Sequence, residues 1–158
     1  MASYTSPQVK ALGQAQLEAL PTTTWAVFSS DQLGYFEANQ IPLIPAGSIA
    51  AISFANIGGL TSDAMKQLLP AQIKALTQQQ LNTLTNVVSG VAKIMDLNDA
   101  QFESFSSSQI PVFQPVLFNN LGTSTINSFN KAAFASLTVA QFQQMTGVNQ
   151  LNGLFSTQ

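Results

Sequence analysis

Apolar residues recur along this chain with a period of eight. Every eighth residue from Val9 to Leu81 is apolar, and so is every residue three places after it, from Leu12 to Leu84. A second series with the same spacing begins at Ile94. All 34 positions are apolar, whereas the overall apolar fraction of 46% would fill about 16 of them by chance. The pattern predicts a tandem repeat of octads, each with a first and a second apolar position.

Polar residues mark a helix start in each octad. Gln precedes the first apolar position in ten octads, and Ser, Thr or Asn often lies three residues before that Gln. Thr at the N-cap with Gln at N3 forms a capping box, and the flanking apolar residues form a hydrophobic staple. Each octad therefore predicts its own short helix of roughly two turns. The ten residues are Gln8, Gln16, Gln32, Gln40, Gln72, Gln80, Gln101, Gln109, Gln141 and Gln150.

Two other interpretations of the period are weaker. In one continuous helix, eight residues advance the apolar face by about 80°, so the apolar stripe would wind around the helix. A β-solenoid, the competing interpretation, requires apolar residues at alternate positions, whereas the spacing here is three. The Ala, Gln and Leu content also favours helix. Two of the seven prolines, Pro42 and Pro111, follow a first apolar position, so we expect broken or shortened helices around them.

A helix of two turns is not stable alone in water, so each octad must pack on its neighbours. Stacked octads bury one continuous core, which predicts an all-α solenoid. The 158 residues then form a single domain of about nineteen octads, with repeat blocks at 5–84 and 94–155. Two irregular octads are included in this count, one at the phase break of 85–93 and one at Leu151 and Leu154. We interpret the phase break as a kink or joint.

The composition removes several classes of function. The chain has five Lys, no Arg, no His and no Cys, and only 8% of its residues are charged. These counts exclude Cys/His zinc sites, disulfides, thiol chemistry and a Ser-His-Asp triad. Five scattered Lys residues also do not form the clustered basic surface that binds nucleic acid. We therefore predict no enzyme, no cofactor and no nucleic-acid partner.

Two groups of residues need a separate interpretation. Asp96, Asp99 and Glu103 could offer oxygen ligands to Ca²⁺, but their spacing does not match an EF-hand loop. The favoured interpretation is that Asn98 caps a helix and that the carboxylates are solvated, so no metal site is predicted. Trp25 occupies an ordinary first apolar position, and we expect a core residue whose N–H finds a partner.

The chain shows neither a membrane span nor a classical signal peptide. No stretch reaches the roughly 18 uninterrupted apolar residues that a spanning helix requires. The first ten residues are polar and lack an apolar segment. Secretion would then use another route, or a signal has been removed.

The two ends of the array are as apolar as its interior. Val9 and Leu12 open the array, and Leu151, Leu154 and Phe155 close it. Solenoids that exist as free monomers have polar capping repeats. We therefore predict self-association through these five residues, either by end-to-end stacking or because the array belongs to a longer one. The alternative is that the terminal segments fold over the ends.

The octads resemble tandem arrays found in very large bacterial secreted and surface proteins of the adhesin-like type. The clearest matches are 76–84, which reads Leu-Thr-x-x-Gln-Leu-x-x-Leu, and 137–145, which reads Leu-Thr-x-x-Gln-Phe-x-x-Met. This chain departs from such arrays by being short, rich in Phe and broken in phase. The resemblance implies surface exposure and a structural or adhesive role, and it carries over no functional residue.

Two hypotheses for function follow. The first is a structural protein that self-assembles end to end, as the subunit of an extracellular filament or surface layer. Its partner is then another copy of the chain. The second is a monomeric interaction or adhesion module that binds a protein or a glycan. Both place the chain outside the cell or at its surface, although a cytoplasmic location is also compatible with the sequence.

Overall fold

The computed structural model describes residues 4–87 and 92–145, and within these ranges the chain is helical, with no β-strand. The predicted all-α class is therefore confirmed. The described residues form twelve α-helices and five 3₁₀ helices. The elements of the first block are α1 (Ser6–Lys10), α2 (Gln14–Ala19), α3 (Thr22–Val27), α4 (Ser30–Leu33), η1 (Ala38–Leu43), α5 (Ala46–Ala51), η2 (Ile57–Gly59), α6 (Ser62–Met65), α7 (Pro70–Ala75) and α8 (Gln78–Leu84). Those of the second are η3 (Lys93–Asp96), α9 (Asp99–Phe102), η4 (Ile110–Val112), η5 (Pro115–Asn119), α10 (Thr123–Ser128), α11 (Lys131–Ala135) and α12 (Val139–Gln144).

Each of these seventeen elements contains the first apolar position of one octad. The helices are three to seven residues long, which is one to two turns and shorter than the predicted length. In nine octads the second apolar position is the C-cap, with ψ between 125° and 149°. This extended residue ends the helix and directs the chain into the next octad. A total of nineteen helices is not confirmed, because Val88, Val91, Leu151 and Leu154 lie outside the described residues.

Proline and capping residues act where the pattern predicts them. Pro42 lies inside η1 and Pro111 inside η4, and both elements are 3₁₀ helices of three to six residues. Six N-cap side chains accept a hydrogen bond from the N3 backbone N–H, which satisfies one of the free donors at the helix start. These N-caps are Ser29, Thr61, Thr77, Asn98, Asn130 and Thr138.

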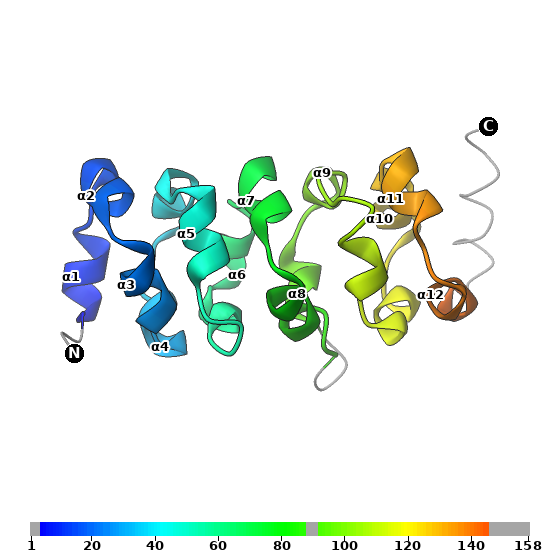
Figure 1. Ribbon diagram of the computed structural model, residues 1–158, viewed down its shortest axis with the longest axis horizontal. Coiled ribbons are helices and arrows are strands. Elements are labelled where there is room, and N and C mark those ends of the chain that lie inside the picture. Colours follow the sequence, from blue (N-terminus) through cyan, green and yellow to red (C-terminus); the bar gives the residue numbers. More distant parts are fainter. Residues whose placement is uncertain (1–3, 88–91, 146–158) are drawn as a thin grey trace.

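The short helices are arranged in an elongated row, with α1 and α2 at one end and α11 and α12 at the other (Figure 1). The elements in closest contact lie three octads apart, as the pairs α3 with α5 and α5 with α7 illustrate. The core runs continuously along the row, and fifteen of the seventeen first apolar positions are at most 1% exposed. No helix among the described residues is long and apolar enough to cross a membrane.

One close contact between octads depends on a glycine. Gly59 in η2 lies against Ser30 at the start of α4, and a Cβ on Gly59 would come within 2.6 Å of the Ser30 Cα. The adjacent Gly58 has nothing within 4 Å of the corresponding position. Packing therefore requires glycine at position 59 but not at position 58.

Candidate functional site

Where Gln precedes a first apolar position, its side chain caps the helix of its own octad. In nine octads its Oε1 accepts the backbone N–H of the residue three places earlier, at 2.8–3.0 Å. This is the N-cap half of the capping box, and it confirms the capping role predicted from the sequence. The contact also fixes the orientation of the side-chain amide.

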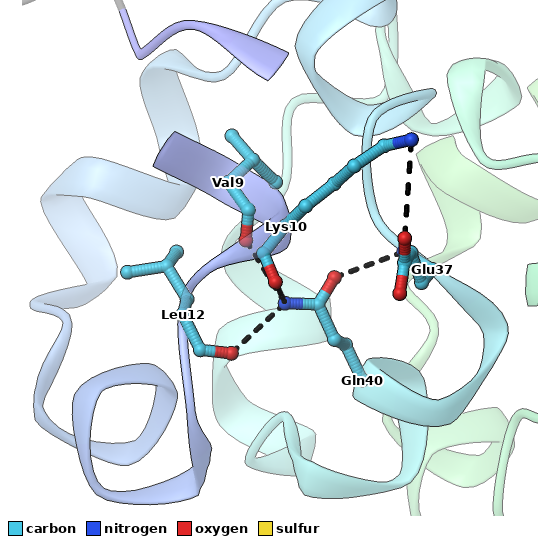
Figure 2. Close-up of polar contacts among 5 residues, drawn as sticks. All are labelled: Val9, Lys10, Leu12, Glu37 and Gln40. Atoms are coloured by element: carbon cyan, nitrogen blue, oxygen red, sulfur yellow. Dashed lines mark hydrogen bonds and ion pairs between the residues drawn. The ribbon is translucent and has the colours of Figure 1, made fainter. Parts of the chain in front are cut away.

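The same amide then reaches into another octad. Nε2 of Gln40 donates to the backbone carbonyls of Val9 and Leu12, both at 2.9 Å, while its Oε1 holds the N–H of Glu37 (Figure 2). The acceptors lie 31 and 28 residues earlier, which is the octad four places back. They are the carbonyls of the first and second apolar positions of that octad.

Six residues make this double contact, and we call them the glutamine ladder. All six side chains are at most 6% exposed, so the oxygen and the nitrogen of each side-chain amide find hydrogen-bond partners within the protein and not in water. Each amide therefore links the N-terminus of its own helix to the backbone of an octad earlier in the chain. The members are Gln40, Gln72, Gln80, Gln101, Gln109 and Gln141.

The sequence separation between ladder donors and acceptors changes at the phase break. Gln101 donates to the carbonyls of Met65 and Leu68, which are 36 and 33 residues earlier. These separations are each five longer than the 31 and 28 of Gln72, whereas one more octad would add eight. Across the break the ladder therefore joins the same two apolar positions of an earlier octad, with five more residues between donor and acceptors than within a block.

Asparagine replaces the ladder contact in two octads. Asn56 stands at the Gln position, and its shorter side chain donates only to the Phe28 carbonyl, at 2.9 Å. In α11 the Gln position is Ala133, and the N-cap Asn130 takes over. Asn130 Oδ1 accepts the Ala133 N–H while its Nδ2 donates to the carbonyls of Glu103 and Phe105. In these two octads the link to an earlier octad is therefore kept although Gln is missing.

Gln8 and Gln16, at the α1 and α2 end, differ from the ladder. Their Oε1 atoms accept the N–H groups of Thr5 and Gly13, both at 2.9 Å, as in the interior. Both side chains are exposed, and within residues 4–87 and 92–145 no acceptor lies opposite either Nε2. This end of the row therefore presents two oriented amide donors.

The α11 and α12 end differs in the opposite sense. Phe142 in α12 occupies a first apolar position but is 47% exposed, and Phe134 in α11 is only partly buried. The nearby Val139 is 75% exposed. No side-chain amide of the described residues donates to the carbonyls of α11 or α12 that correspond to the ladder's acceptors. This end therefore presents apolar rings and backbone acceptors.

The five residues predicted for self-association are placed unequally. Val9 has no exposed area, so its side chain cannot contact another molecule in this conformation. Leu12 is partly buried against the core, and Leu20 of the next octad has the same intermediate burial. Leu151, Leu154 and Phe155 lie outside the described residues.

The sequence prediction missed the ladder because it assigned Gln to capping alone. One signal could have revealed it. Glu completes a capping box as well as Gln does, yet Glu is absent from this position throughout the chain. Only the amide of Gln adds a donor, so the preference for Gln indicates a second, donating contact.

The acidic residues and Trp25, considered above as candidates, make separate contacts and form no common site among the described residues. Asp96 pairs with Lys93 at 2.9 Å and accepts from Ser62, while Asp99 accepts from Thr125 at 2.7 Å. No group of three or more acidic residues suited to a metal ion occurs among the described residues. Trp25 is fully buried as predicted, but its Nε1 has no hydrogen-bond partner there, contrary to the prediction.

Comparison of this chain with protein-family models, curated proteins and solved structures gives no match in any of the three. Any inference about function therefore depends on the chain's own contacts.

Proposed function

We propose that this chain is a solenoid that assembles end to end, as the structural subunit of an extracellular filament or surface layer. The observation that carries the proposal is the loss of burial toward one end of the row. First apolar positions are at most 1% exposed up to Ile126, Phe134 is partly buried, and Phe142 is 47% exposed. In the interior, elements pack against octads three places away, and we propose that a second copy completes the packing around Phe142.

The other end of the row offers a partly matching surface. Leu12 and Leu20, at second apolar positions of the first octads, are only partly buried. In the interior, second apolar positions such as Phe28 and Leu60 are 1% exposed. Stacking one end on the other would therefore cover half-buried apolar side chains on both sides of the junction.

Charge does not oppose such stacking. The net charge is −2, and from Ser104 to the last residue the only charged side chain is Lys131. A surface rich in Ser, Thr, Asn and Gln with a net charge near zero gives little repulsion between copies. The resemblance to bacterial surface arrays supports the extracellular location that we propose.

The proposal is tested by sedimentation velocity and electron microscopy of the purified chain over a range of concentrations. We expect unbranched filaments above a critical concentration. Phe142→Glu should raise that concentration, because the junction would lose apolar burial and would enclose a carboxylate. A cost of about 2 kcal/mol corresponds to about 30-fold.

Phe54→Glu is the matched control, because Phe54 is 52% exposed but lies between α5 and η2 in the interior of the row. It should leave the critical concentration near that of the unmodified chain. The proposal is overturned if the unmodified chain stays monomeric at high concentration. Equal effects of the two substitutions would show that the chain associates through its sides.

A further inference from the structure

We propose that the glutamine ladder continues across the junction between two copies. In this arrangement Nε2 of Gln8 and Gln16 in one copy donates to backbone carbonyls four octads back, in the last octads of the next copy. The inference depends on the proposed end-to-end assembly and adds to it the donors, the acceptors and the polarity of the junction.

The donors are already oriented as in the interior. Oε1 of Gln16 accepts the Gly13 N–H at 2.9 Å, and Oε1 of Gln80 accepts the Thr77 N–H at the same distance. In Gln80 this contact directs Nε2 to the carbonyls of Ile49 and Ile52. Gln16 therefore needs no rearrangement to bind an octad placed in the corresponding position, which limits the entropy lost on association.

The acceptors have the same chemistry as those inside the row. Interior amides of the ladder bind the carbonyls of the first and second apolar positions, as Gln141 binds Ile110 and Phe113. The corresponding carbonyls in the octad of α11 belong to Phe134, within the helix, and to Leu137, just after it. No side chain of the described residues donates to either of them. The exposed ring of Phe142 lies in the next octad, so polar and apolar contacts would form on the same surface.

The two ends are complementary rather than alike. The α1 and α2 end supplies donors, and the α11 and α12 end supplies acceptors. A junction that joins unlike ends leaves one free donor end and one free acceptor end after every addition. Such a heterologous contact does not stop at an isologous dimer, and it produces an open filament where the rotation between copies does not close a ring.

Charge-matched substitutions separate this inference from the proposed function. In Gln8→Glu with Gln16→Glu, an oxygen remains to accept the N-cap N–H, and only the donor is removed. Both side chains are exposed in the monomer, so its thermal unfolding should be unchanged. The control is Gln67→Glu with Gln79→Glu, which adds the same charge at exposed interior positions.

We expect the first pair of substitutions to raise the critical concentration at least about tenfold and the control pair to leave it unchanged. If both pairs assemble like the unmodified chain, the ladder does not cross the junction, although end-to-end assembly stands. If the unmodified chain does not assemble, the proposed function and this inference both fail.

The polarity has its own test. One variant, Gln8→Glu with Gln16→Glu, keeps only its acceptor end, and Phe142→Glu keeps only its donor end. Below its own raised critical concentration each variant alone should be monomeric, and an equimolar mixture at the same concentration should sediment as a one-to-one dimer. If the variants dimerise separately and not with each other, like ends meet and the proposed polarity is wrong.

Discussion

Gln80 gives the sharpest test of the ladder within a single copy. Its side chain is 1% exposed, its Oε1 accepts the Thr77 N–H at 2.9 Å, and its Nε2 donates to the carbonyls of Ile49 and Ile52 at 2.9 and 2.7 Å. Gln80→Glu preserves the shape and the capping acceptor. It replaces the donor with an oxygen that faces two carbonyl oxygens.

The expected loss follows from those two contacts. Each lost hydrogen bond costs about 1 kcal/mol, and the Ile52 carbonyl, left without a partner among the described residues, costs about 1–3 kcal/mol in total, whereas the Ile49 carbonyl still accepts the Ile52 N–H. Burial of the new carboxylate adds to this, so we expect unfolding free energy to fall by about 3–5 kcal/mol at neutral pH. The total unfolding free energy of a typical domain is only about 5–15 kcal/mol. The loss should shrink in acid, because a protonated carboxyl can donate to one of the two carbonyls.

Urea unfolding followed by circular dichroism measures this loss. Gln79→Glu is the control, since the neighbouring Gln79 is exposed in the same helix. We expect the control to change the unfolding free energy by less than about 0.5 kcal/mol. A loss at Gln80 no larger than that of the control would refute the reasoning, because the buried amide would then contribute nothing beyond capping.

Two further substitutions test other contacts between octads by the same assay. Gly59→Ala should lower the unfolding free energy by about 1–3 kcal/mol because its Cβ would overlap Ser30, whereas Gly58→Ala should leave it nearly unchanged. Equal effects would show that the backbone at Gly59 and Ser30 moves apart without cost. Asn130→Asp keeps the acceptor for the Ala133 N–H but loses the donor to the carbonyls of Glu103 and Phe105, so it should cost at least about 2 kcal/mol. An Asn130→Asp variant as stable as the parent would contradict the bridging role.

The local structure could be predicted from the sequence because each octad carries its own start signal. Thr77 and Gln80 cap α8 as the pattern indicates, and the apolar Leu81 and Leu84 are fully buried. Pro42 lies in a 3₁₀ helix, where its octad was expected to be irregular. These features depend on residues within one octad, so the order of the residues is enough to reveal them.

The contacts between octads could not be predicted in the same way. They depend on how many octads separate stacked neighbours, and the period alone does not contain that number. The four-octad reach of Gln40 and the five-residue change at Gln101 appear only once the octads are stacked. The full burial of Val9 was not predicted either, whereas Leu12 in the same octad is only partly buried.

The central claim is that copies join end to end with the glutamine ladder continued across the junction. A helical reconstruction of the assembled chain by electron cryomicroscopy tests it most directly. The account predicts unlike ends in contact, with Nε2 of Gln8 and Gln16 within about 3 Å of backbone carbonyls at the α11 and α12 end of the next copy. Dispersed single particles, or filaments in which like ends or lateral faces meet, would contradict it.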